Sequence, residues 1–362
     1  MIQSIYDSIK PTKGNPVEKI YRTLVLNATL VSVALILLPA SVQAVEVSVS
    51  GQVNRLIMSV DNGSESGVVH ADNSVSGTRW RFAGDGELDN GMTAGLLYET
   101  QLQSNPSDKI TADSLDSDGI GGDVGDGDHF STRQANVWLK GNFGKVTIGQ
   151  GSGAVDGSAE IDDSGTGVIQ YNGSSSDLLG SMEFGNSGVT VGSVRAYFDG
   201  LGRNDNIRYD AAIGDLALAG SLGNGDKIEA AVTYKIETVK FKVGLWDQKD
   251  SGTGIAGSAV SATWGGDGGL NLTGAYGSDD RDGDPSNVYL KVGFKMGDNA
   301  FGVDWSETSD LGAGDADSVS VAWVGAMMQG VELYASYRVE SLDGVSDADD
   351  IDALVGGMRV KF

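Results

Sequence analysis

Four carboxylates lie close together in the segment that follows a strand predicted over residues 145–150. They are Asp156, Glu160, Asp162 and Asp163, and Gly, Ser and Ala residues fill much of the space between them. Carboxylates grouped in this way can act as fixed charges that bias the passage of ions. A solvated acidic surface loop is the simpler alternative, and both readings stay open at this point.

Residues that usually carry out catalysis are scarce in this chain. It contains no cysteine and only two histidines, His70 and His129, which both lie in polar stretches. This composition excludes disulfide scaffolds, thiolate metal sites and Cys nucleophiles, and it leaves no credible His-based metal site or catalytic triad. We therefore expect a protein that is not an enzyme and that has no cofactor.

Arginines supply the opposite charge. Arg79 and Arg81 alternate with aromatic residues, so both project from the polar face of one predicted strand. Arg55 and Arg133 fall on the apolar side of their strands, and each needs a local irregularity, such as a bulge, to reach the polar face. If the strands enclose a pore, these arginines would oppose the four carboxylates across it.

The elements that must position these charges are strands. After Ala44 the dominant sequence period is two, as in 45–54, 92–99, 239–245, 288–296 and 331–339, and no sustained helical period follows. Charged residues interrupt the polar faces in mid-strand, while the opposite faces are apolar along whole strands. A soluble β-sandwich would also alternate, but a lipid-facing band needs this uniformly apolar face.

Short and long connections alternate along the chain. Short turns are predicted at about 85–91, 141–144, 213–214, 237–238, 265–268, 297–299 and 327–329. Longer loops rich in Gly, Asp and Ser are predicted at 61–75, 103–130, 151–205, 223–227, 248–256, 278–286, 308–317 and 341–350. These fifteen connections join sixteen strands, the pattern of an all-β, antiparallel, up-and-down transmembrane barrel with both termini on the periplasmic side.

Both ends of the chain fit this interpretation. Lys10, Lys13, Lys19 and Arg22 precede an apolar run over 24–38, and Ser41 to Ala44 resembles a cleavage site. We predict that residues 1–44 are a signal peptide cleaved after Ala44, with an uncleaved membrane anchor as the alternative. The barrel domain then covers 45–362, and its last strand ends on Phe362, an aromatic residue suited to the membrane interface.

The acidic composition restricts the partners. The chain has a formal charge of −25, which argues against nucleic acid because phosphate binding requires dense Lys and Arg. The stretch 115–128 contains Asp116, Asp118 and Asp123, which could bind calcium incidentally in an external loop. It lacks the spacing of an EF-hand, so we expect a solvated acidic loop.

Several motifs resemble general porins of Gram-negative outer membranes. They are SGQVNR at 50–55, SGTRWRFAG at 76–84, ANVWLKGNFGKVTIGQ at 135–150, GSGAVDGSAEIDDSGTG at 151–167, DGLGRNDNIRYD at 199–210 and the terminal phenylalanine. The resemblance implies a sixteen-stranded barrel, usually a homotrimer, whose third external loop folds into the lumen opposite a basic cluster on the wall. That loop corresponds to 151–205. Asn136 and Trp138 depart from the family, which commonly has an aromatic residue and a glycine there.

The resulting functional expectation is an outer-membrane porin. It would pass ions and small hydrophilic solutes by passive diffusion, and its partners would be outer-membrane lipid, lipopolysaccharide and its own copies. The alternatives are a substrate-selective outer-membrane channel and a secreted, calcium-dependent β-rich adhesin.

Overall fold

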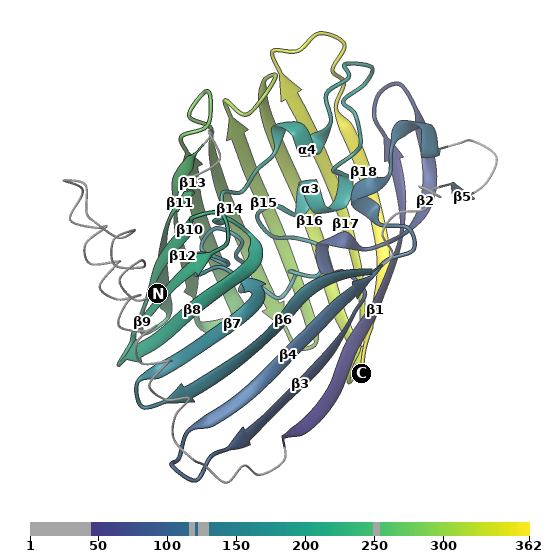
Figure 1. Ribbon diagram of the computed structural model, residues 1–362. Coiled ribbons are helices and arrows are strands. Elements are labelled where there is room, and N and C mark those ends of the chain that lie inside the picture. Colours follow the sequence, from purple (N-terminus) through teal and green to yellow (C-terminus); the bar gives the residue numbers. More distant parts are fainter. Residues whose placement is uncertain (1–44, 116–119, 122–129, 249–253) are drawn as a thin grey trace.

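The computed structural model describes residues 45–115, 120–121, 130–248 and 254–362, which form one closed antiparallel sheet (Figure 1). The sheet closes where β18 (Ile351–Lys361) pairs with β1 (Glu46–Asp61), from Gln52 opposite Lys361 to Asp61 opposite Asp352. Two backbone hydrogen bonds between Gly51 and Phe362, of 2.9 and 3.1 Å, extend this seam. The C-terminus is therefore part of the barrel wall. The predicted signal peptide lies outside the described residues.

The remaining strands follow in chain order around the barrel. They are β2 Ser66–Asp72, β3 Arg79–Glu87, β4 Thr93–Leu102, β5 Ile120–Gly121, β6 Phe130–Gly141, β7 Gly144–Ser152, β8 Arg203–Ile213, β9 Leu216–Gly223, β10 Lys227–Ile236, β11 Val239–Gln248, β12 Ile255–Gly265, β13 Leu270–Asp279, β14 Ser286–Met296, β15 Asn299–Ser309, β16 Asp315–Met328 and β17 Val331–Asp343. Neighbours in this order pair antiparallel, apart from the interruptions at β2 and β5.

The barrel has sixteen positions because β2 and β3 together occupy one of them and β5 occupies none. The first half of β1 pairs with β3, the second half pairs with β2, and the 3₁₀ turn η1 (Ser74–Ser76) separates the two. The two-residue β5 is a parallel addition to β2. The sequence analysis placed 66–72 in a loop, which is wrong, because these residues extend the hairpin from β1.

The two faces of the sheet differ as the alternation predicts. In β14, Leu290 and Val292 are 54% and 51% exposed, whereas Tyr289 and Lys291 are 1% and 2% exposed. The outward face is thus a band of apolar side chains, which suits lipid. Among the described residues, no helix is both long enough and apolar enough to cross a membrane.

A bulge in β6 changes the direction of one predicted site residue. Glu99 pairs with Gln134, but Thr100 pairs with Thr132, so Arg133 is the extra residue in its strand. The bulge brings Arg133 to the same face as Glu99, to which it is ion-paired. This is the irregularity that the sequence analysis required for Arg133.

The long segment between β7 and β8 covers residues 153–202 and contains α3 (Ser174–Leu179) and α4 (Val191–Val194). Each strand has an exposed apolar face and an opposite face, which we call the covered face. The apolar residues of the segment pack against the covered face of β1, β2 and β18 in one cluster that includes Leu178, Met182, Leu56, Met58 and Val355. At the other side, Arg338 of β17 donates hydrogen bonds to Ser174 and Ser175, both of 2.6 Å, and α3 lies beside these strands in Figure 1. The segment therefore shares one packed core with these strands.

Candidate functional site

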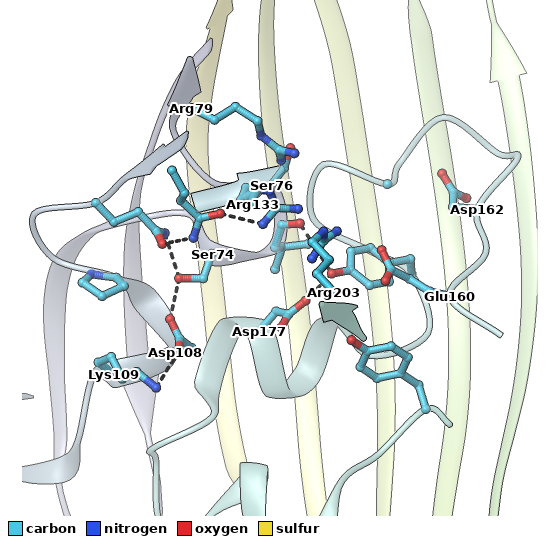
Figure 2. A pocket seen from close by; sticks show the side chains of 17 residues that line it. Ser74, Ser76, Arg79, Asp108, Lys109, Arg133, Glu160, Asp162, Asp177 and Arg203 are labelled. Atoms are coloured by element: carbon cyan, nitrogen blue, oxygen red, sulfur yellow. Dashed lines mark hydrogen bonds and ion pairs between the residues drawn. The ribbon is translucent and has the colours of Figure 1, made fainter. Parts of the chain in front are cut away.

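A charged cavity of about 820 Å³ lies between the segment 153–202 and the barrel wall. It is lined by Ser74, Val75, Ser76, Arg79, Gln101, Gln103, Pro106, Asp108, Lys109, Arg133, Glu160, Asp162, Gly167, Tyr171, Asp177, Tyr197 and Arg203. Four of these residues are basic and four are acidic. We call this space the charged cavity, and Figure 2 shows its side chains converging from both sides.

The basic wall of the charged cavity is organised by one buried carboxylate. Glu99 is fully buried, accepts hydrogen bonds from Arg81, and accepts another of 2.9 Å from Arg133 Nε. Arg79 Nη1 lies 3.6 Å from Glu99 Oε1. A single negative charge thus gathers three arginines from β3 and β6. Because the positive charges outnumber it, this wall keeps a net positive charge.

Two of the four predicted arginines do not line the charged cavity. Arg81 belongs instead to an adjoining space of about 420 Å³ with Arg359 and Lys361. The Arg55 side chain points to the same face of β1 as Val53 and Ile57, which is the exposed apolar face. No bulge turns it, and it pairs with Asp72 at 2.5 Å.

Two of the predicted carboxylates are held by lysines of the barrel. Asp162 Oδ1 accepts a 2.7 Å hydrogen bond from Lys291 Nζ of β14, and Asp163 Oδ2 accepts one of 2.6 Å from Lys240 Nζ of β11. Lys295 also donates to the carbonyl of Asp163 at 3.1 Å. These two side chains therefore attach the segment to the wall, and their charges are largely compensated.

Glu160 has a different environment. Burial, followed by the neighbouring carboxylates of Asp199 and Asp156, raises its pKa to about 8. Oxygen atoms of Asp156, Glu160 and Asp199 lie within 4.8 Å of one another, a spacing that a cation could use. However, the Asp199 carboxylate already accepts hydrogen bonds from the backbone N–H groups of Gly157, Ala159 and Glu160. The Asp199 carboxylate therefore stabilises the backbone of the segment 153–202 and is not free to bind a cation.

The acidic side of the charged cavity also includes Asp177, which the sequence analysis missed. Its carboxylate accepts a hydrogen bond from the buried Tyr171 hydroxyl. Burial raises the pKa of Asp177 to about 6. Figure 2 shows Asp177, Glu160 and Arg203 facing the same space.

Arg203 is the second important residue that the sequence analysis missed. It is the first residue of β8, it lines the charged cavity and it is exposed. The only feature of the sequence that could have identified Arg203 is its position at the end of the long predicted loop, directly before the next strand. Asp108, Lys109, Tyr171 and Tyr197 were missed as well, because irregular loops have no periodicity that assigns a side chain to one face. The calcium candidates Asp116, Asp118 and Asp123 lie outside the described residues.

The fold and this charged cavity can be compared with known proteins. A model of the Gram-negative porin family matches residues 28–357. The chain belongs to this family. This porin has no match among curated protein sequences. Family and fold are those of outer-membrane diffusion channels, so the protein is a channel of the outer membrane, and the adhesin alternative is wrong.

Solved structures share the architecture of this porin at low sequence identity. The anion-selective porin from Comamonas acidovorans is 18% identical, with 88% of this chain and 100% of that chain covered and a TM-score of 0.62. The trimer form of OmpT from Vibrio cholerae is 12% identical over the same shares, with a TM-score of 0.57. A triple mutant of Rhodopseudomonas blastica porin is 17% identical over the same shares, with a TM-score of 0.56. These likenesses establish the sixteen-stranded barrel.

Proposed function

We propose that residues 153–202 fold into the lumen and that the charged cavity is the constriction through which ions and small hydrophilic solutes diffuse. The main support is the set of ion pairs from this segment to the covered face of distant strands, Asp162 with Lys291 and Asp163 with Lys240. The covered face of a closed barrel is its interior. Passage is passive, and the charged cavity selects by size and by its electric field.

The field runs across the constriction. Arg79 and Arg133 belong to the wall strands β3 and β6, whereas Glu160 and Asp177 belong to the segment 153–202, and all four line the charged cavity. Solutes with separated charges orient in such a field, and ions of each sign follow different sides of the opening. Both walls have small nearby residues, such as Ser74, Ser76 and Gly167, which leave room for water.

Narrowing the charged cavity tests this proposal. Gly167→Trp places an indole in the charged cavity, and the single-channel conductance in a planar bilayer should fall. Asn186→Trp is the matched control, because Asn186 lies on the same segment, is exposed and does not line the charged cavity. Equal conductance of the two variants would remove the segment from the conduction path.

We also propose that the porin is a homotrimer and that Arg55 lies in its subunit interface. Arg55 pairs with Asp72 and donates to Ser104 at 3.0 Å on the outward apolar face. An arginine facing lipid near the bilayer centre costs about 2–4 kcal/mol. A neighbouring subunit would remove this cost, while the rest of the outward face contacts outer-membrane lipid and lipopolysaccharide.

The trimer is tested by charge reversal. Arg55→Glu should remove the trimer band in an unheated detergent gel, whereas Ser278→Glu on the outward side of β13 should leave it intact. A trimer that survives Arg55→Glu would place the interface elsewhere. Signal-peptide cleavage after Ala44 is a separate proposal, and N-terminal sequencing of the mature protein should begin at Val45.

A further inference from the structure

A second cavity, of about 420 Å³, lies beside the turn that joins β6 to β7. Its charged lining consists of Lys140, Lys145, Arg208, Lys242 and Asp210, and small apolar residues form most of the rest. We call it the basic cavity. None of its described lining residues lines the charged cavity. Four positive charges against one negative charge make this a distinct site that the constriction does not explain.

Two of the basic residues are fixed by the start of the long segment. Arg208 Nη1 donates a 2.7 Å hydrogen bond to the carbonyl of Gly153, and its guanidinium also binds Asp210. Lys242 Nζ donates a 2.6 Å hydrogen bond to the carbonyl of Asp156. These contacts hold the positive charges in place, and the hydrogen bond of Lys242 is to a neutral carbonyl and not to a carboxylate.

The other two basic residues are available to a ligand. Within the described part of the chain, neither Lys140 nor Lys145 forms an ion pair with a carboxylate. Lys145 Nζ lies 4.9 Å from the centroid of the Trp138 ring, a cation–π contact that restrains the ammonium group. Trp138 fits because Gly95 faces it, and a Cβ at Gly95 would approach the indole to 2.3 Å. The ammonium group is thus positioned but retains free N–H donors.

The basic cavity is at the short-turn end of the barrel. Lys140 is the second-last residue of β6, and Lys145 is the second residue of β7. Lys242 is also near the turn that precedes β11. In an outer-membrane barrel the short turns face the periplasm. A solute moving inward would meet these charges after passing the constriction.

We propose that the basic cavity binds phosphate-bearing solutes as they leave the constriction on the periplasmic side. Several ammonium groups and a fixed guanidinium around one small space match the charge and the oxygen acceptors of a phosphate group. This inference rests on the proposed function, because it requires the barrel to conduct solutes past this site.

The test is one-sided block of single channels in a planar bilayer by inorganic pyrophosphate. The orientation of the channel in the bilayer is determined with the variant Ser346→Cys, which places a cysteine in an external loop. The chain has no native cysteine, so an impermeant maleimide labels only this position and shows which side of the bilayer the loops face. Pyrophosphate added from the short-turn side should interrupt the current at lower concentration than pyrophosphate added from the loop side. In the double variant Lys140→Gln, Lys145→Gln, the blocking concentration from the short-turn side should rise about tenfold.

The matched control removes two positive charges at the other end of the barrel, by Lys227→Gln and Arg281→Gln. It should leave the block from the short-turn side unchanged. In the single variant Lys140→Gln, the blocking concentration from the short-turn side should rise about threefold. This variant replaces the double variant in the test if the double variant assembles poorly. Equal block from both sides, or block that the double variant retains, overturns the inference. The absence of conductance steps in the unmodified protein would instead contradict the proposed function.

Discussion

Glu99 Oε1 accepts a 2.9 Å hydrogen bond from Arg133 Nε, and the residue that donates it is the extra residue of a β-bulge. The bulge and the buried carboxylate depend on each other, since Arg133 reaches Glu99 only because the strand is irregular. Arg79 and Arg81 complete the group. Glu99 therefore controls both the position and the net charge of the basic wall.

Glu99→Gln should make the channel more anion-selective. The substitution keeps the shape but removes the one negative charge among three arginines, so their repulsion rises. Breaking a buried ion-pair group of this kind costs about 3–5 kcal/mol. The reversal potential in a salt gradient reports the selectivity, and heat resistance of the folded barrel reports the stability. Glu65→Gln in an exposed loop is the control, and an equal shift in both variants would contradict the role of Glu99.

The selectivity should depend on pH through Glu160. Its pKa is raised to about 8, so the side chain gains negative charge as pH rises through that value, and cation preference should increase. Because the folded-state pKa lies above the ordinary value of 4.5, protonated Glu160 favours docking of the segment, and this stabilisation weakens as pH rises from 4.5 through about 8.

The measurement for Glu160 is the reversal potential between pH 5 and 9. Glu160→Gln should abolish the change near pH 8, whereas a change near pH 6 should remain, since the pKa values of Asp177 and Asp199 are both raised to about 6. The charged groups that act on Glu160 are Asp199, Asp156, Asp177 and Arg203. A variant that retains the change near pH 8 would assign it to another group.

Asp162→Asn should loosen the long segment. The Lys291 side chain is fully buried, and the Asp162 side chain is 7% exposed, so the variant leaves a buried ammonium group without its counter-charge. The expected loss is about 3–5 kcal/mol of stability, and Lys291→Met added to it should recover part of that loss. Unfolding of the detergent-solubilised barrel in denaturant measures both. If the double variant is no more stable than Asp162→Asn, the pair is not the anchor that we infer.

Glu229→Gln should increase the frequency of spontaneous channel closure. Glu229 of β10 accepts a 3.0 Å hydrogen bond from the Val155 N–H and one of 2.6 Å from the Leu201 N–H, and so joins the start of the long segment to its end. Hydrogen bonds to a charged group contribute about 1.5–3 kcal/mol each. Open-state lifetimes at fixed voltage give the result, and unchanged lifetimes would show that the bridge is dispensable.

The sequence predicted the barrel well, for a physical reason. A strand with lipid on one side and water on the other must alternate, so the faces of β14 and β17 could be read residue by residue. The same rule placed Arg79 and Arg81 on the face of β3 opposite the exposed Trp80, as the structure has them. It failed for β2, where polar residues such as His70 and Asp72 interrupt the pattern and resemble a loop.

The site was predicted only in part. The rule of alternation placed Arg133 outward and identified a bulge as the exception, but no local signal shows that the bulge exists. Arg55 lacks such a bulge and stays outward. The carboxylates Asp162 and Asp163 were recognised as a group, yet their partners Lys291 and Lys240 are 129 and 77 residues away, respectively. Pairings over such distances depend on the closed barrel and leave no trace in local sequence.

The attachments of the long segment also set an order of folding. The segment follows β7, but it is tied to Lys291 of β14 and, across 164 residues, to Arg338 of β17. Contacts between residues so far apart in sequence form late, because the intervening chain must first be ordered. If the segment forms the constriction that we propose, a barrel that still lacks its last strands has no fixed constriction, and the selective part of the channel is completed only after the wall.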